Sequence, residues 1–327
     1  MLITRTPFRM SFFGGGTDYP DYYTEYGGSV LSTTIDKYCY LSMRPLPPFF
    51  PYKGQLTYSR IERFNSADEV QHPLVRAALQ YIPTDRIQIA YDADLPAASG
   101  IGSSSAFAVG LLQGLHAIRG AYPDAMTLAK EAIHLERDMC AEAGGVQDQL
   151  AAAFGGLNRM DFSAEGFRVT PLSLPQERKQ TLQENLMLLF TGFTHFSGAV
   201  AEEQKKNIPS TLPQLDEMKQ LTNIAQDILV SGDLDDFGRL LHDTWMLKRS
   251  LSGRISSYDI DTLYKQLRGA GALGGKLLGA GSGGFMLLYV PREDRDRLKA
   301  MFSDYMFVPF TFEDSGSRII YQNDSEG

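Results

Sequence analysis

A segment rich in glycine and serine constrains the fold of this chain more than any other feature. Residues 96–106 read PAASGIGSSSA, between an extended stretch (87–91) and a run of small and apolar residues (106–118) that is typical of a helix. A helix start offers free backbone N–H groups and the positive end of the helix dipole, so it favours anions. The order of strand, glycine loop and helix therefore predicts a phosphate site, although Ser103 or Ser104 acting only as an N-cap would give the same pattern. The segment is no Walker A loop, because no Gly-Lys-Ser/Thr follows.

The size and composition of the chain predict a globular protein with two domains. Its 327 residues exceed the usual span of one hydrophobic core, and 43% of them are hydrophobic. A cleft between two domains is a common place for a small-molecule site. The formal net charge of −8 opposes non-specific binding to nucleic acid.

Cysteine usage and hydropathy favour a soluble protein of the reducing cytoplasm. Cys39 and Cys140 are the only cysteines, so the sequence supports neither a disulfide framework nor a zinc cluster. We find no signal-peptide pattern and no run approaching the ~20 apolar residues of a membrane span. We therefore expect no nucleic-acid partner and no membrane partner.

Strand-like and helix-like segments are mixed along the chain, which predicts an α+β fold with its active site in the cleft between two domains. Residues 2–13 and 28–44 are extended in character, and a polar, turn-prone stretch precedes the apolar run at 186–190. We place the domain boundary near residue 180, giving domains 1–180 and 181–327. Helices are expected at 126–143, 146–154, 200–206, 212–229, 234–248 and 259–270.

A second glycine cluster near residue 280 matches a dinucleotide fingerprint by spacing alone. Gly279, Gly281 and Gly284 satisfy G-x-G-x-x-G, but the apolar run 285–290 follows where the fingerprint requires a helix. A Rossmann interpretation therefore fails on context. The loop could bring backbone close to a ligand or could be a tight turn between two elements.

Glu136 is a carboxylate on an apolar face of the helix expected at 126–143. Ala129 and Ala132 lie on the same face by the i+3 and i+4 rule. A carboxylate there needs a compensating charge, either a distant basic residue or a bound cation. Magnesium becomes the better interpretation if the glycine loop holds phosphates, since this ion combines few carboxylates with substrate phosphates.

Three further charged residues lie beside glycines. Asp148 falls in the first turn of a short helix, where it either stabilises the helix dipole, by about 0.3–1 kcal/mol, or takes a proton from an attacking hydroxyl. Arg9 and Asp18 flank the triplet of residues 14–16 and could be surface groups or part of a site.

Three separated segments together resemble the GHMP kinases, the superfamily of galactokinase, homoserine kinase, mevalonate kinase and phosphomevalonate kinase. They read TPFRMSFFGGGTDYPDYY, LPAASGIGSSSA and KLLGAGSGGFML, and their order and spacing are similar to the three motifs of that family over essentially the whole chain. The GGGTD, GGVQDQ and WMLKRSLS stretches look most like the branch that phosphorylates D-glycero-D-manno-heptose 7-phosphate, with fucokinase-like enzymes as neighbours. In the segment 191–204, where that branch tends to carry a basic residue, this chain has His195.

The resemblance implies an ATP- and Mg²⁺-dependent sugar kinase and assigns a role to each motif. The ATP phosphates would be held by Pro96, Ser99, Gly100, Ile101, Gly102, Ser103, Ser104 and Ser105. Ser104 and Glu136 would bind magnesium, Asp148 would be the base on the anomeric hydroxyl, and Arg9 would lie close to the transferred phosphate. The acceptor would contact Gly16, Thr17, Asp18, Gly281 and Ser282.

A phosphorylated acceptor also needs cationic partners, for which Lys248 and Arg249 are the candidates. The expected partner is therefore a sugar or a sugar phosphate, and a homodimer stays open as the state of assembly. Two alternatives remain: another GHMP sugar kinase such as an L-fucokinase, or a non-catalytic nucleotide-binding regulator on the same fold. Retention of both Glu136 and Asp148 argues against the regulator, because a binder needs no base.

Overall fold

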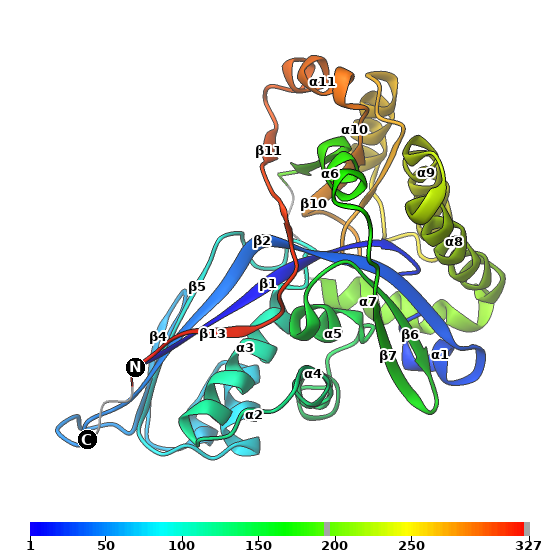
Figure 1. Ribbon diagram of the computed structural model, residues 1–327. Coiled ribbons are helices and arrows are strands. Elements are labelled where there is room, and N and C mark those ends of the chain that lie inside the picture. The colour runs from blue at the N-terminus through cyan, green and yellow to red at the C-terminus, as the bar shows by residue number, and fades with distance from the viewer. Residues whose placement is uncertain (193–196, 324–327) are drawn as a thin grey trace.

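The computed structural model describes residues 1–192 and 197–323, and it contains two β-sheets with helices around them (Figure 1). His195 lies outside the described residues. The mixture of sheets and helices confirms the α+β class. None of the described helices combines the length and the apolar character that a membrane span needs.

The larger sheet has nine strands. Its main order is β13-β1-β2-β5-β3-β4; β12 and β6 also pair with β2, and β7 pairs with β6. All pairings are antiparallel except that of β3 with β5. The strands are β1 (Leu2–Phe13), β2 (Gly28–Pro45), β3 (Gly54–Thr57), β4 (Ile61–Phe64), β5 (Ile87–Ala93), β6 (Asn158–Ser163), β7 (Gly166–Pro171), β12 (Phe312–Glu313) and β13 (Arg318–Gln322).

The smaller sheet belongs to the second half of the chain. It is antiparallel in the order β11-β8-β10-β9, with β8 (Leu186–Phe190), β9 (Gly274–Leu277), β10 (Phe285–Tyr289) and β11 (Met306–Val308). After β11 the chain returns to the larger sheet, where β12 pairs with β2 and β13 with β1, as the red end of the ribbon shows (Figure 1). Each half of the chain therefore has a sheet, and the last described strands belong to the first one.

Helices cover the larger sheet and connect the two halves. One face of that sheet carries α2 (Pro73–Tyr81), α3 (Ser103–Ile118), α4 (Ala125–Ile133) and α5 (Gln147–Phe154) (Figure 1). The long pair α8 (Leu212–Ser231) and α9 (Leu234–Ser250) packs against strands of both sheets. The remaining helices are α1 (Pro20–Tyr26), α6 (Gln176–Asn185), α7 (Ser197–Asn207), α10 (Tyr258–Gly269) and α11 (Arg295–Met301), with short turns η1 (Ala67–Glu69), η3 (Ile208–Ser210) and η4 (Arg292–Asp294).

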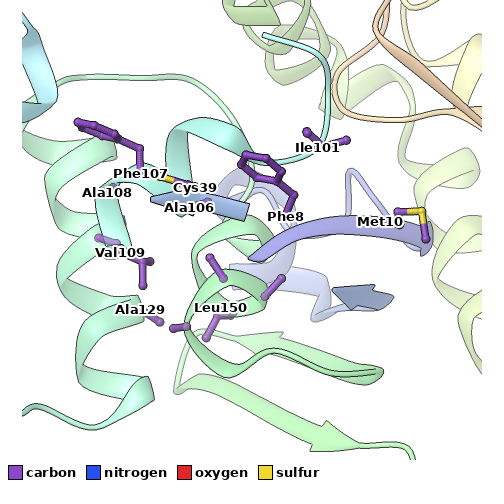
Figure 2. Packing of buried hydrophobic residues seen from close by; sticks show 14 of the residues in the cluster. Phe8, Met10, Cys39, Ile101, Ala106, Phe107, Ala108, Val109, Ala129 and Leu150 are labelled. Carbon is purple, nitrogen blue, oxygen red and sulfur yellow. The ribbon is translucent and has the colours of Figure 1, made fainter. Parts of the chain in front are cut away.

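The core between β1 and the helices fixes the glycine loop at the start of α3. Figure 2 shows Phe8 of β1 beside Ala106 of α3, with Leu150 of α5 close by. Small residues along α3 let it approach the sheet so closely that Thr4 Oγ1 donates a hydrogen bond to Gly110 O at 3.1 Å. Ile101 is fully buried and anchors the loop to this core.

The helix expected at 126–143 is not a single α-helix. The α-helical part, α4, ends at Ile133, and a π-helical turn, η2 (His134–Met139), follows with Cys140 as its C-cap. Ala141 and Gly144 have positive φ angles of 54° and 147°, which an α-helix cannot accommodate. The expected continuation to residue 143 is therefore wrong, and Glu136 lies in the π-helical turn, a feature frequent at functional sites.

Candidate active site

A cavity of about 810 Å³ lies between the segments that the sequence analysis selected. It is lined by the end of β1, the glycine loop before α3, the loop from η2 to α5, and residues of α7, α9 and β9. This volume lies within the range of about 300–1,000 Å³ that is usual for ligand pockets.

The glycine loop presents backbone to this cavity, as a phosphate site requires. Gly100 and Gly102 have φ angles of 82° and 73°, and Gly102 is the N-cap of α3 without a side-chain capping bond. Ser104 and Ser105 donate their hydroxyls to Glu136 instead, at 2.7 and 2.8 Å. The N-cap interpretation of the serines is therefore not what the structure contains, and the first amides of α3 stay free of side-chain caps.

Glu136 is held by neutral donors alone in the described part of the chain. It is 2% exposed, and Gln149 Nε2 donates to it together with the two serine hydroxyls. Burial raises the pKa of Glu136 to about 7, and the nearby charge of Glu142 adds to the rise. The structural salt bridge considered above is absent among these residues, so the carboxylate keeps the capacity to hold a cation.

Arg9 and Asp148 form the most direct link between distant parts of the chain at the cavity. Arg9 Nε and Nη2 donate to the two carboxylate oxygens of Asp148 at 2.6 and 2.7 Å, which is a bidentate pair. Arg9 Nη1 also donates to Gly100 O at 2.6 Å. The guanidinium therefore joins the acidic start of α5 to the glycine loop.

Asp18 lies beside this pair and is fixed by backbone and side-chain donors. It accepts hydrogen bonds from Gly16 N at 2.8 Å and from Gln147 Nε2 at 3.0 Å. Burial raises the pKa of Asp18, and the charge of Asp148 adds to the rise. Thr17 does not line the cavity; its hydroxyl donates to Gly14 O and Ser29 O and so stabilises the turn.

Two buried lysines complete the charged centre, and only one of them was expected. Lys248 of α9 donates to Gly279 O, and Lys276 of β9 donates to Phe12 O at 3.0 Å. Both line the cavity. The sequence analysis missed Lys276; the available signal was a charged residue in the otherwise apolar strand stretch GGKLL.

Several expected residues do not reach the cavity. Arg249 follows Lys248 on α9 and so points to another side of the helix, where it pairs with Asp261. Gly281 and Ser282 also lie off the cavity, whereas Gly279 and Ala280 line it. Arg249, Gly281 and Ser282 therefore do not line this cavity, and their expected contacts with the substrate remain a prediction.

Some residues of the expected phosphate loop support its backbone and do not face the cavity. Pro96, Ser99 and Ile101 do not line the cavity, whereas Ala97 and Ala98 do. Ser99 Oγ donates to Pro96 O at 2.6 Å, and Ser99 O accepts from Phe285 N at 3.1 Å. These residues hold the backbone in shape and are not expected to touch a ligand through their side chains.

An aromatic group that the sequence analysis did not single out lies at the end of the cavity next to the glycine loop. The ring of His72 stacks on Phe107 with centroids 5.1 Å apart, and Tyr58 meets His72 edge-on at 5.2 Å. Tyr91 meets Phe107 edge-on at 5.2 Å. Such a group offers flat apolar faces of the kind that a planar base needs.

Arg137 also lines the cavity, together with the acidic residues Glu142 and Glu202. Arg137 Nη1 donates to Gly145 O at a long 3.4 Å, and the guanidinium forms no ion pair with a described residue. Gly145 lies directly against Asp18, since a Cβ at this glycine would overlap the Asp18 carboxylate. Arg137 therefore keeps unused N–H donors, and it contacts Gly145, which in turn lies against Asp18.

Comparisons with known proteins identify the family to which this sequence and fold belong. The model of the GHMP kinases N terminal domain matches residues 70–156, and that of the GHMP kinases C terminal matches residues 221–307.

The D-glycero-alpha-D-manno-heptose 7-phosphate kinase of Campylobacter jejuni is 29% identical over 96% of this chain and 97% of its own length. The structure of a D-glycero-D-manno-heptose 1-phosphate kinase from Bacteroides thetaiotaomicron is similar with a TM-score of 0.82, at 23% identity over 99% of this chain and 100% of that one. That of Lactococcus lactis galactokinase complexed with galactose gives a TM-score of 0.76, at 18% identity over 97% of this chain and 94% of the other. Because the two family models occupy more than half of the chain, in the expected order, the chain belongs to the GHMP kinases, a family of phosphotransferases.

Proposed function

We propose that this GHMP kinase transfers the γ-phosphoryl group of ATP to the anomeric hydroxyl of a heptose phosphate, D-glycero-D-manno-heptose 7-phosphate. The observation that carries the proposal is the bidentate pair of Arg9 and Asp148. Through this pair, Arg9 connects the carboxylate of Asp148 to Gly100 O of the glycine loop. A cationic group and a carboxylate at one point suit the transfer of a phosphoryl group to a hydroxyl.

The nucleotide is expected at the end of the cavity that α3 closes. GHMP kinases use ATP as phosphate donor, and the free amides of Ser103, Ser104 and Ser105 together with the helix dipole favour its phosphates there. The rings of His72 and Phe107 would then accept the base. The negative charge of the chain makes such local donors necessary.

Magnesium fits the pair of Ser104 and Glu136. Ser104 Oγ donates to Glu136 Oε1 at 2.7 Å, so a hydroxyl and a carboxylate oxygen, which would both suit Mg²⁺ beside substrate phosphates, already lie together. The described residues contain no cluster of three or more His, Cys, Asp or Glu side chains that could hold a metal ion, which fits an ion that relies on substrate phosphates. When bound, the ion would neutralise charge on the transferred group.

In the transfer step, the acceptor oxygen attacks the γ-phosphorus while the bond from that phosphorus to the bridging oxygen of ADP breaks. Asp148 receives the hydroxyl proton, and Arg9 stabilises the charge on the equatorial oxygens of the loose transition state. Asp18 orients a neighbouring hydroxyl of the sugar. ADP leaves with the charge of the broken bond.

The distal phosphate of the acceptor needs a cation beyond Asp18, and Arg137 is the best-placed candidate. Its guanidinium has one long hydrogen bond and can offer a pair of N–H donors to a phosphate. Lys248, the earlier candidate, is close enough to Arg9 and Asp148 to feel their charges, so it belongs to the transfer centre instead.

The experiment is an ADP-release assay of the purified protein with magnesium, ATP and a matched panel of acceptors. The panel contains D-glycero-D-manno-heptose 7-phosphate, the same heptose without phosphate, L-fucose and galactose. We expect the highest kcat/KM for the phosphorylated heptose. A preference for L-fucose would establish the fucokinase alternative, and no ADP release with any acceptor would contradict the proposal.

A further inference from the structure

Three cations from distant parts of the sequence converge at one wall of the cavity. Arg9 lies on β1, Lys248 on α9 and Lys276 on β9, and all three line the cavity while being 5%, 5% and 1% exposed. We call these three residues the cation triad. Buried like charges repel one another strongly, so such a cluster needs either paired carboxylates or an anionic ligand.

The carboxylates present are insufficient for the whole triad. Asp148 directs both oxygens to Arg9, and Asp18 is held by Gly16 N and the side chain of Gln147. Within the described ranges, neither lysine forms an ion pair with a carboxylate. Burial lowers the pKa of Lys248 to about 8, with a further contribution from Arg9, and burial together with Lys248 lowers the pKa of Lys276 well below its usual range.

Each member of the triad donates to a backbone carbonyl of a different glycine-containing segment. Arg9 donates to Gly100 O of the loop before α3, and Lys248 donates to Gly279 O of the loop after β9. Lys276 donates to Phe12 O, just before the glycines 14–16. Lys248 also donates to Leu277 O at 3.5 Å, and each ammonium group, with three N–H donors, keeps at least one for the cavity.

We propose that Lys276, with Lys248 and Arg9, binds the γ-phosphoryl group that is transferred, so that Lys276 is a catalytic residue of the reaction. This inference rests on the proposed function, which supplies ATP as the anion. The three cations of the triad would then lie where the negative charge of the transferred group is greatest. Their hydrogen bonds to backbone carbonyls also connect the three glycine-containing segments around that group. Preorganised cations of this kind stabilise the transferring group without reorganisation during the reaction.

The proposal is tested by comparing nucleotides with and without a γ-phosphoryl group. Dissociation constants for ADP and for the non-hydrolysable analogue AMP-PNP are measured calorimetrically, with magnesium, for the wild type and for Lys276→Met. We expect Lys276→Met to weaken AMP-PNP binding about 10- to 100-fold, as for loss of a charged hydrogen bond. ADP binding should stay within about threefold, and kcat should fall by at least the same factor as AMP-PNP binding.

Two further variants separate charge from structure. Lys276→Gln keeps a donor for Phe12 O without the charge, so it should lose AMP-PNP affinity as Lys276→Met does. Lys265→Met, at an exposed lysine of α10, is the matched control and should bind both nucleotides as the wild type does.

The outcomes distinguish the two proposals. Wild-type protein that binds neither nucleotide would contradict the proposed kinase function and this inference with it. Wild-type binding with equal losses for ADP and AMP-PNP in Lys276→Met would overturn the γ-phosphoryl contact. Wild-type behaviour of Lys276→Gln would assign Lys276 to the hydrogen bond with Phe12 alone and would also overturn it.

Discussion

Arg9 and Asp148 are separated by 139 positions in the sequence, and their pairing defines where chemistry can take place. Both oxygens of Asp148 accept from Arg9, so an acceptor hydroxyl must use the remaining lone pairs of the carboxylate. The pair therefore holds the proposed proton acceptor, Asp148, beside the cation that we propose to meet the transferred charge, Arg9. Asp148 is therefore the first residue to substitute in a test of the proposed mechanism.

Asp148→Asn keeps the shape of the side chain but replaces one acceptor oxygen with an NH₂ group. We expect kcat to fall by about 10²-fold or more, because the proton acceptor is lost while the substrates still bind. The measurement is kcat together with the dissociation constants of ATP and sugar. Turnover near the wild-type rate would remove Asp148 from the mechanism, and loss of sugar binding alone would make it a substrate ligand.

Glu136 predicts a dependence of stability on pH. Its pKa is raised to about 7 in the folded chain, so between about pH 4.5 and 7 the folded state binds the proton that the unfolded state has lost. Stability is then greatest below this window and falls as pH rises through it, by on the order of 3 kcal/mol. The measurement is the difference in Tm between wild type and Glu136→Gln, without magnesium, from pH 5 to 8.

In Glu136→Gln this component should vanish, so the variant gains stability relative to wild type as pH rises, and it should lose magnesium-dependent turnover. Glu217→Gln makes the same chemical change at an exposed position of α8 and should follow the wild type. A pH-independent difference between wild type and Glu136→Gln would show that the buried carboxylate does not titrate in this window.

At the residue scale, the sequence predicted the acidic residues and Arg9 better than the lysines. Asp18 and Asp148 lie beside glycines, which mark them as candidates even without a structure. Lys276 also follows two glycines, but its burial could not be expected, because it results from the packing of the second sheet against the end of β1. Arg249 was expected at the site but does not line the cavity, because the sequence alone does not say which side of α9 faces it.

At the element scale, the two glycine loops stabilise each other by direct backbone contact. A Cβ built on Gly100 would overlap Leu278 O, and one built on Gly279 would overlap the backbone of Gly100. Phe285 N also donates to Ser99 O at 3.1 Å. The loop that resembles a dinucleotide fingerprint therefore supports the glycine loop before α3, and both glycine positions are required by space as well as by φ.

Gly100→Ala tests this contact. We expect a loss of stability of several °C in Tm and a loss of ATP affinity, because the methyl group must push the two loops apart. Gly120→Ala is a matched control: its φ of 76° is close to the 82° of Gly100, but a Cβ there meets nothing within 4 Å. Both variants carry the strain of a left-handed backbone, so the difference between them measures the contact. Equal effects would mean that the loops do not depend on close approach.

Regular elements were largely predictable, whereas long-range strand pairing was not. The helices expected at 212–229, 234–248 and 259–270 correspond closely to α8, α9 and α10 because their apolar periodicity is strong. The hairpin of β6 and β7 was read as a polar connection, and β13 was missed because a short, exposed strand carries little pattern. Their positions come from pairing with β2 and β1.

At the scale of the whole molecule, the proposed division near residue 180 does not separate two independent cores. One buried cluster joins Phe12 and Phe13 of β1 with Phe237 of α9, whose ring lies 5.4 and 5.1 Å from theirs. A second buried cluster joins Tyr22 of α1 with Trp245 of α9. Both clusters therefore contain residues from each side of the division, and the two halves are expected to depend on each other.

This arrangement predicts that the chain unfolds in one cooperative transition, although chains of this length often unfold in several steps. Two native probes report on the two clusters. Trp245, the single tryptophan, is fully buried in the second cluster, and Cys39 is buried in the first. In a Cys140→Ser variant, urea unfolding followed by Trp245 fluorescence and by pulsed labelling of Cys39 should give the same midpoint.

Magnesium and ATP, the proposed ligands of the folded cleft, should move both midpoints to higher urea together, because ligand binding stabilises every part that unfolds with the site. Circular dichroism at the same urea concentrations provides the third curve, which should superimpose on the other two. Exposure of Cys39 at lower urea than the change in Trp245 fluorescence would show that the larger sheet opens on its own. In that case the packing of Phe237 against β1 would be too weak to couple the halves, and the division near residue 180 would separate two units of independent stability.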